Sequence, residues 1–177
     1  DANALTAGDP DNDGDLDVIA ISGTGEWTTL GLFEDQGNAV FAPYVGIGGI
    51  PYGGAPLSTD LDGDGLEDLL ITTYYNNGLF WLKNNGGSQF TYMELLIDDD
   101  LGMSPPTAID MDEDGDPDIL YTLYYFNSIF WRQNQGGGSF APATELATVH
   151  GIPSHVHVLD VDGDGIRDLA YTLQADS

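Results

Sequence analysis

The stretch Asp60-Leu61-Asp62-Gly63-Asp64-Gly65-Leu66-Glu67-Asp68 decides the fold, because the chain contains four copies of its pattern. The other copies occupy residues 9–17, 110–118 and 160–168, and all four fit the form D-x-D-x-D-G-x-x-D. Successive copies start 51, 50 and 50 residues apart. A regular spacing of this size is typical of repeat architectures such as propellers and solenoids. We therefore expect the rest of the chain to hold these four copies in place.

The spacing of the acidic residues suits a hard divalent cation. The first, third and fifth residues of each copy can direct side-chain oxygens inward, and the glycine at the sixth position permits a sharp turn. The backbone carbonyl of the seventh residue and the carboxylate of the ninth can complete the shell. An all-oxygen shell favours Ca²⁺ over Zn²⁺ or copper, and Mg²⁺ is disfavoured because it dehydrates reluctantly. Acidic surface turns are the alternative, since Asp and Gly favour turns in any case.

An EF-hand is the nearest competing calcium loop, and the sequence argues against it. That motif needs an acidic residue at position 12 and helices on both sides. Position 12 is Ala20, Ile71, Tyr121 or Tyr171 in the four copies, and each of these residues lies in a strand-like run.

The charge of the chain is concentrated in the same four copies. The 177 residues include 30 acidic and 3 basic ones, which gives a net charge of −27, and 20 of the acidic residues lie in the copies. Four bound Ca²⁺ ions would add +8 and leave −19. Nucleic acids and anionic membrane surfaces require a basic surface, so we exclude both as partners, and no apolar run is long enough for membrane insertion. The chain has no cysteine, so metal binding is expected to supply stability in place of disulfides.

Short strand-like segments surround each copy, and no segment reads as a long amphipathic helix. In the second repeat, Asn76-Asn77-Gly78 predicts a hairpin turn between two of these strands. Phe80-Trp81 recurs as Phe130-Trp131 in the third repeat, and we interpret these aromatic residues as core. The predicted strands are 4–9, 18–21, 28–33 and one starting at 40; 55–59, 69–75, 79–83 and 90–97; and 156–159 and 169–173.

Four strands in each unit of about 50 residues, with the acidic copy between the first two, resemble the FG-GAP/VCBS family. This is the repeat of integrin α-subunit propellers and of many secreted bacterial proteins and fungal lectins. The likeness covers essentially the whole chain and includes the segment "LFWLKNNGGSQF" at residues 79–90. It implies an all-β fold, a β-propeller of four-stranded blades, with about three and a half blades in one domain over residues 1–177. The blades are expected at about 4–48, 54–98 and 104–148, and the half blade at about 154–174.

In that family calcium lies in the loop between the first and second strands of a blade, so the resemblance implies up to four Ca²⁺ ions per chain. Asp15, Leu66, Asp116 and Ile166 would bind through their backbone carbonyls. We interpret the four sites as structural rather than as contacts to another ligand. The implied ligands are Asp9, Asp11, Asp13, Asp15 and Asp17; Asp60, Asp62, Asp64, Leu66 and Asp68; Asp110, Asp112, Asp114, Asp116 and Asp118; and Asp160, Asp162, Asp164, Ile166 and Asp168.

The family usually closes a ring of seven or eight blades, which is more than this chain supplies. Because unpaired strand edges invite pairing with another chain, three arrangements follow: a fragment of a longer propeller, an oligomer that closes a ring, or a head-to-tail polymer. We favour self-association or missing blades over a closed four-bladed monomer.

The leading functional hypothesis is a non-enzymatic, calcium-binding module that binds a carbohydrate or protein ligand, or that serves assembly. The chain starts at Asp1 without Met, and extracellular calcium sites need roughly millimolar calcium, so a secreted or cell-surface location is expected. One alternative is a structural subunit of an extracellular filament or matrix. The other is a polysaccharide-active enzyme, for which His155 and His157 could bind a transition metal only with a third ligand. We predict no catalytic residue and no organic cofactor.

Overall fold

The computed structural model describes residues 2–23, 26–73, 78–97 and 103–174, and their regular structure is almost entirely β-strand. Three antiparallel four-stranded sheets follow one another along the chain, and a two-stranded sheet comes after them. The all-β prediction is confirmed. The first two sheets contain β1 (Ala2–Gly8), β2 (Asp17–Ser22), β3 (Thr28–Phe33), β4 (Val45–Ile50), β5 (Gly53–Thr59), β6 (Asp68–Thr73), β7 (Gly78–Asn84) and β8 (Phe90–Ile97). The third and fourth contain β9 (Thr107–Ile109), β10 (Asp118–Leu123), β11 (Ser128–Arg132), β12 (Thr144–Thr148), β13 (Ile152–Leu159) and β14 (Asp168–Gln174).

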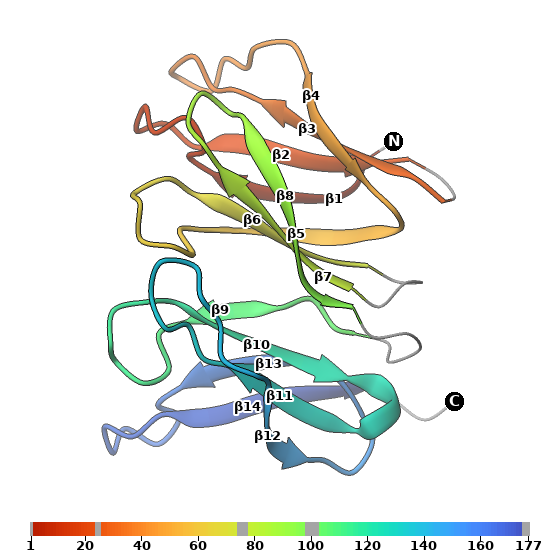
Figure 1. The fold of residues 1–177 in the computed structure, drawn as a ribbon, viewed down its shortest axis with the longest axis vertical. Coiled ribbons are helices and arrows are strands. Elements are labelled where there is room, and N and C mark those ends of the chain that lie inside the picture. The colour runs from red at the N-terminus through yellow and green to blue at the C-terminus, as the bar shows by residue number, and fades with distance from the viewer. Residues whose placement is uncertain (1, 24–25, 74–77, 98–102, 175–177) are drawn as a thin grey trace.

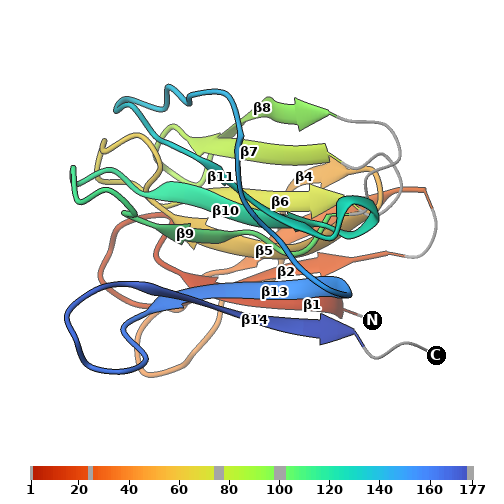
Figure 2. The ribbon, with the colours of Figure 1, turned by 90° about the horizontal axis from the view of Figure 1, so that it is seen from below.

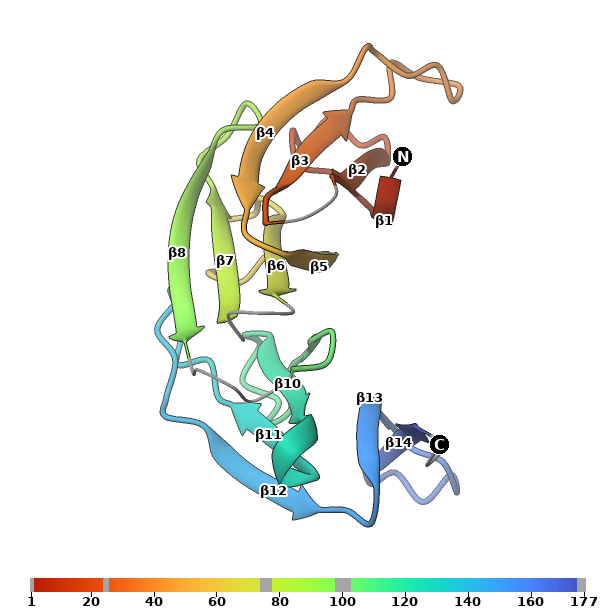
Figure 3. The same cartoon turned by 90° about the vertical axis from the view of Figure 1, so that its right-hand side faces the viewer.

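The four sheets are stacked in chain order, as Figure 1 shows along its vertical axis. Within each sheet the strands also keep their order in the sequence, so each is paired with its antiparallel neighbours. Figure 3 shows that the stack is curved, with β4, β8 and β12 along its convex side. This arrangement of successive sheets around an arc is propeller-like, whereas the number of blades in a complete ring stays a prediction. Figure 2 shows the two-stranded sheet from below, with β13 and β14 side by side.

The hydrophobic core is divided into three clusters, and each lies between two successive sheets. Ile19 and Leu30 of the first sheet pack against Leu69 and Ile71 of the second. The next cluster contains the predicted core residue Trp81, which is buried between the second and third sheets. The strands β6 and β10 are buried along their whole length because a sheet covers each of their faces. This explains why both strands read as continuous apolar runs rather than as alternating ones.

The fourth sheet is much less buried than the others. Val156 and Leu169 pack against the third sheet in the last core cluster, but the second half of β14 is exposed. Among the described residues no further sheet covers its other face.

The predicted start of the fourth strand at Val40 is wrong. Instead, the N–H of Gln36 donates to the carbonyl of Val40 at 2.8 Å, which closes a tight turn, and β4 begins only at Val45. Pro43 lies between the turn and the strand, where it cannot donate a hydrogen bond to a ladder. The predicted hairpin turn at 76–78 lies largely outside the described residues. In the part of the chain that the structure describes, no helix is long and apolar enough to cross a membrane.

Candidate metal centres

Each acidic copy forms the loop between the first and second strands of a sheet. We call them loop 1 (residues 9–17), loop 2 (60–68), loop 3 (110–118) and loop 4 (160–168). Figure 1 shows all four loops on the left-hand side of the molecule, so the acidic groups share one rim.

The first aspartate of each loop is held by backbone N–H groups. Asp60, for example, accepts hydrogen bonds from Gly63 at 2.8 Å and Gly65 at 2.9 Å. The sixth residue has a positive φ in every loop, which a side chain would disfavour. The predicted sharp turn is therefore confirmed at all four glycines, with φ of 94° at Gly14, 88° at Gly65, 100° at Gly115 and 84° at Gly165.

Three carboxylates converge in each loop, with one oxygen from each lying within 4.8 Å of the others. Oxygens this close repel one another unless a cation or protons neutralise them, and their chemistry fits Ca²⁺. The converging sets are Asp9, Asp11 and Asp13; Asp60, Asp62 and Asp68; Asp110, Asp112 and Asp114; and Asp160, Asp162 and Asp168. The other implied ligands lie outside these sets and stay predictions: Asp17, Asp64, Asp118 and Asp164, and the carbonyls of Asp15, Leu66, Asp116 and Ile166.

The ninth aspartate connects its loop to the third strand of the sheet. The carboxylate of Asp68 is 0% exposed, and it accepts the N–H groups of Leu61 at 3.1 Å and Asn84 at 2.7 Å. Asp118 repeats this arrangement with Met111 at 3.0 Å and Asn134 at 2.7 Å. Both carboxylates are thus fixed in position before any ion binds.

Loop 1 departs from this arrangement because its second residue is Pro10, which has no N–H group. The Oδ1 atom of Asp17 accepts the N–H of Asp35 at 2.8 Å. Its buried Oδ2 atom has no hydrogen-bond donor among the described residues, and neither has Oδ1 of Asp11. A buried carboxylate oxygen without a donor is costly, so loop 1 has two oxygens available for a cation.

Burial raises the pKa of both Asp17 and Asp68 to about 6. It also raises the pKa of Asp118, and that of Asp11, where the charge of Asp13 adds to the effect. The charged form of these groups is therefore disfavoured without a metal. A divalent cation has to compete with protons for them at mildly acidic pH.

The buried side chain of Asn84 connects loop 1 to loop 2. Its Nδ2 atom donates to the carbonyl of Pro10 at 2.6 Å and to the carbonyl of Glu67 at 3.0 Å. Glu67 adds a second link, because its carboxylate accepts the N–H of Asp9 at 2.8 Å. The two loops are therefore joined by hydrogen bonds that cross from one sheet to the next.

The same connection recurs between loops 2 and 3, where Asn134 donates to the carbonyls of Leu61 at 2.7 Å and Pro117 at 3.1 Å. Loop 4 reaches loop 3 through Arg167, which donates to the carbonyl of Asp110. In the first sheet the equivalent residue is Asp35, whose carboxylate has no proton to donate in its charged form.

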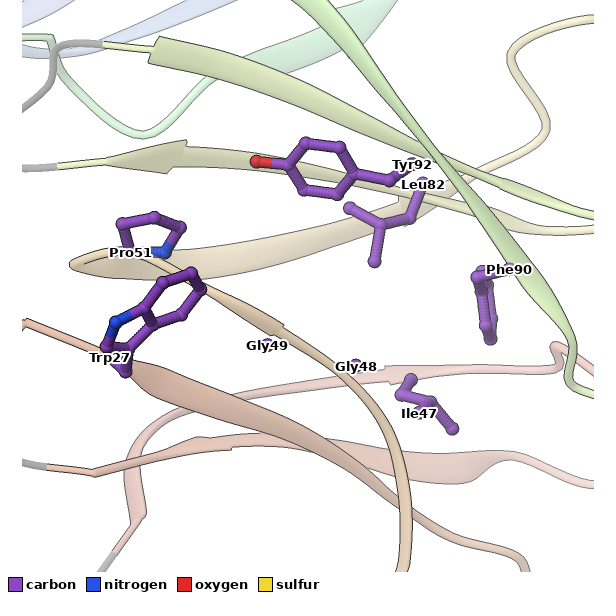
Figure 4. A pocket seen from close by; sticks show the side chains of 8 residues that line it. All are labelled: Trp27, Ile47, Gly48, Gly49, Pro51, Leu82, Phe90 and Tyr92. Atoms are coloured by element: carbon purple, nitrogen blue, oxygen red, sulfur yellow. The ribbon is translucent and has the colours of Figure 1, made fainter.

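A pocket separate from the loops lies between β4 of the first sheet and the outer strands β7 and β8 of the second. It holds about 380 Å³ and is lined by Trp27, Ile47, Gly48, Gly49, Pro51, Leu82, Phe90 and Tyr92. Figure 4 shows Trp27 and Pro51 at one end of the pocket and Ile47 and Phe90 at the other. A Cβ atom added at Gly48 would meet nothing within 4 Å, so β4 leaves this wall of the pocket open.

Sequence reasoning found the loops but missed the residues that connect them. The repetition of Asn84 as Asn134 was visible, yet its role depends on carbonyls 74 and 73 residues away. The pocket was missed for the same reason, because its lining comes from two sheets. His155 and His157 are exposed on β13, and neither belongs to a cluster of three metal-ligating side chains in the described residues.

Comparison with solved structures supports the fold. A solved structure with the same fold is an Agrocybe aegerita lectin, whose structure explains its specific recognition of non-reducing terminal N-acetylglucosamine. The two chains are 20% identical with a TM-score of 0.67, and the match covers 94% of this chain and 46% of the lectin. This chain thus spans less than half of the lectin's length. Comparison with curated proteins gives no match.

The model of the FG-GAP-like repeat matches the chain twice, over residues 60–121 and 110–171. Each match begins at the first aspartate of a loop and ends in the second strand of the following sheet. Together the two matches cover more than half of the sequence and include loops 2, 3 and 4. The chain therefore belongs to the FG-GAP-like repeat family.

Proposed function

We propose that the chain is a non-enzymatic, calcium-stabilised module that binds carbohydrate in the pocket between its first two sheets. The observation that carries this proposal is the aromatic lining of the pocket. Trp27 and Tyr92 are 66% and 43% exposed and both line this pocket, so their rings are accessible to a ligand. The volume of about 380 Å³ lies within the range of small-molecule sites. Aromatic rings in such a site can pack against the C–H face of a sugar.

A neutral sugar fits this pocket better than an anionic ligand. None of the residues that line it is charged, and the chain as a whole carries a net charge of −27. Long-range repulsion would therefore oppose the approach of an anion. The Agrocybe aegerita lectin of the same fold recognises N-acetylglucosamine, which makes this sugar the first to test.

The lining also supports binding over catalysis. Sugar hydrolysis needs an acid and a base in the cleft, and the pocket is lined by no Asp, Glu or His among the described residues. We assign the acidic residues of the rim to calcium instead, as structural ligands. Sites of this kind fill at the millimolar calcium outside cells, so we propose a secreted or cell-surface location.

Assembly is a second candidate function, and the fourth sheet favours it. Val161, Ile166 and Tyr171 are exposed there, and in the described residues β14 pairs only with β13. Further sheets, from another chain or from the same protein, would cover these apolar groups. Electron microscopy of the purified protein in calcium would distinguish a closed particle from a filament.

The carbohydrate proposal is tested on a glycan array, followed by calorimetric titration with N-acetylglucosamine in millimolar calcium. Gly48→Phe should abolish binding because its ring would occupy the pocket. Gly46→Phe is the matched control, since an added Cβ there meets only a Tyr44 ring carbon, at 4.0 Å. Trp27→Ala should weaken binding by about tenfold or more, as expected for loss of about 1.4 kcal/mol.

Absence of binding to every neutral glycan on the array would reject the carbohydrate proposal. Binding that survives Gly48→Phe would place the ligand elsewhere on the molecule and reject this pocket as its site.

A further inference from the structure

One position beside the loops carries a different charge in each of the first three sheets. Glu34, Lys83 and Gln133 occupy it, each directly before the residue whose backbone N–H binds the ninth aspartate of the loop. The three side chains are therefore structurally equivalent, although they are negative, positive and neutral.

Lys83 places its ammonium group among the carboxylates of loop 2. It forms ion pairs with Asp62 and with Asp64, the latter at 2.7 Å. These are the third and fifth residues of the loop, which are implied calcium ligands. The lysine side chain is only 27% exposed, so it is packed against the loop rather than extended into solvent. Its charge thus neutralises the same carboxylates that would bind the ion.

Gln133 contacts the equivalent carboxylate of loop 3 without carrying a charge, since its amide nitrogen donates to Asp112 at 2.5 Å. A guanidinium is also present at loop 3, but Arg167 contacts the carbonyl of Asp110 and the carboxylate of Glu113, at 3.6 Å. Neither of these groups is an implied ligand.

Glu34 adds a negative charge to loop 1. It stands at the position from which the equivalent Lys83 reaches loop 2, directly before the residue that donates its N–H to Asp17. Loop 1 also has the buried, donorless Oδ2 atom of Asp17, whose residue is 0% exposed. This orphaned oxygen is an observation separate from the acidic cluster itself, and it points to a bound cation there.

We propose that this position sets the calcium affinity of each loop. Glu34 makes loop 1 the tightest of the three, Gln133 leaves loop 3 intermediate, and Lys83 makes loop 2 the weakest because calcium must displace its ammonium group. This inference rests on the proposed calcium binding. Lys83 then competes with calcium for the carboxylates of loop 2. Its ammonium group neutralises the loop at low calcium and leaves it when calcium binds.

Nuclear magnetic resonance can follow each loop separately in the full chain. The amides of Gly14, Gly65 and Gly115 each donate to the first aspartate of their own loop, at 3.0, 2.9 and 3.0 Å. Their signals should therefore report calcium binding site by site as free calcium is varied with chelator buffers. We expect the half-saturation concentration to be lowest at Gly14 and highest at Gly65.

Exchanging the side chains tests the cause of this order. Lys83→Gln should lower the half-saturation concentration of loop 2 by about three- to fivefold, the upper part of the range expected for a partly exposed ion pair. Gln133→Lys should raise that of loop 3 by a similar factor, and Glu34→Gln should raise that of loop 1. Tyr125→Lys adds the same charge at a residue that is 77% exposed and lies beyond the end of β10 away from loop 3, and it should leave the half-saturation concentration of loop 3 within about twofold.

The outcomes separate this inference from the proposal on which it rests. If no glycine amide responds to calcium, calcium binding itself is rejected. If the amides respond but both Lys83→Gln and Gln133→Lys leave every half-saturation concentration within about twofold, calcium binding stands and the role of this position is rejected. An equal shift with Tyr125→Lys would also reject it, because overall charge would then explain the effect.

Discussion

Loops 2 and 4 have nearly the same sequence, yet the second and fourth sheets, which contain them, are buried to very different extents. Residues 61–65 read Leu-Asp-Gly-Asp-Gly and residues 161–165 read Val-Asp-Gly-Asp-Gly. Leu61 packs against the third sheet and is 0% exposed, whereas Val161 is 64% exposed. The second residue of a loop is therefore buried only where a following sheet covers it. Stability in such a stack is a property of the interfaces between units as well as of the units themselves.

Removing calcium is expected to have the largest effect, and to affect the fourth sheet first. Each site with free calcium at about 100 times its Kd should contribute about 2.7 kcal/mol to the free energy of unfolding. Thermal unfolding with and without excess chelator measures the total. Hydrogen exchange should show β13 and β14 losing protection before β6 and β10. An unchanged melting temperature in chelator would contradict the structural role of the ions.

Truncating the second residue of a loop compares the two sheets directly. Leu61→Ala should lower the free energy of unfolding by about 2–4 kcal/mol, because it opens a cavity between the second and third sheets. Val161→Ala removes an exposed side chain and should change it by no more than about 0.5 kcal/mol. Urea unfolding in saturating calcium measures both. Equal effects would mean that Val161 is covered by an interface that the described residues lack.

The asparagine links provide a smaller test of the same idea. Asn134→Ala leaves the carbonyls of Leu61 and Pro117 without their donor, which should cost about 1–3 kcal/mol. Gln135→Ala is a suitable control, since it removes an exposed amide from the same turn. If the two variants had the same free energy of unfolding, the link between loops would make no measurable contribution to stability.

The dependence of stability on pH should change sign when calcium is removed. In the metal-free protein the pKa of Asp17 and Asp68 is about 6, against 3.8 for an ordinary aspartate, so the folded state binds protons more tightly. Their ionisation therefore destabilises the fold above about pH 6, and stability should rise as the pH falls from 7 towards 5. With calcium present, protons compete with the ion and stability should fall over that interval. Melting curves at matched pH values, with and without chelator, test both directions.

The features that the sequence predicted are those determined by neighbouring residues. The loop turns require glycine at Gly14, Gly65, Gly115 and Gly165, and the strand predicted at 69–75 agrees with β6 (Asp68–Thr73) over the described residues. The start of β4 was predicted wrongly because the backbone bond between Gln36 and Val40 closes a turn in a segment with strand-like composition. Lys83 and the pocket at Trp27 could not be predicted, because both depend on how separate strands and sheets approach each other.

The asparagine links run in one direction, from each sheet to the loop of the sheet before it. The second sheet has both a donor, Asn84, that reaches the preceding loop and a carbonyl, that of Leu61, that accepts from the next sheet. The third sheet has the donor Asn134, and the carbonyl of Asp110 in its loop accepts from Arg167 of the fourth. The first sheet has only the carbonyl, because Asp35 replaces the donor. A protein engineer could therefore lengthen the array by inserting duplicates of the second or third unit. A duplicate of the first unit in the interior would instead place the carboxylate of Asp35 against the loop carbonyl of the preceding sheet. Both groups are hydrogen-bond acceptors, so that interface would lack its link.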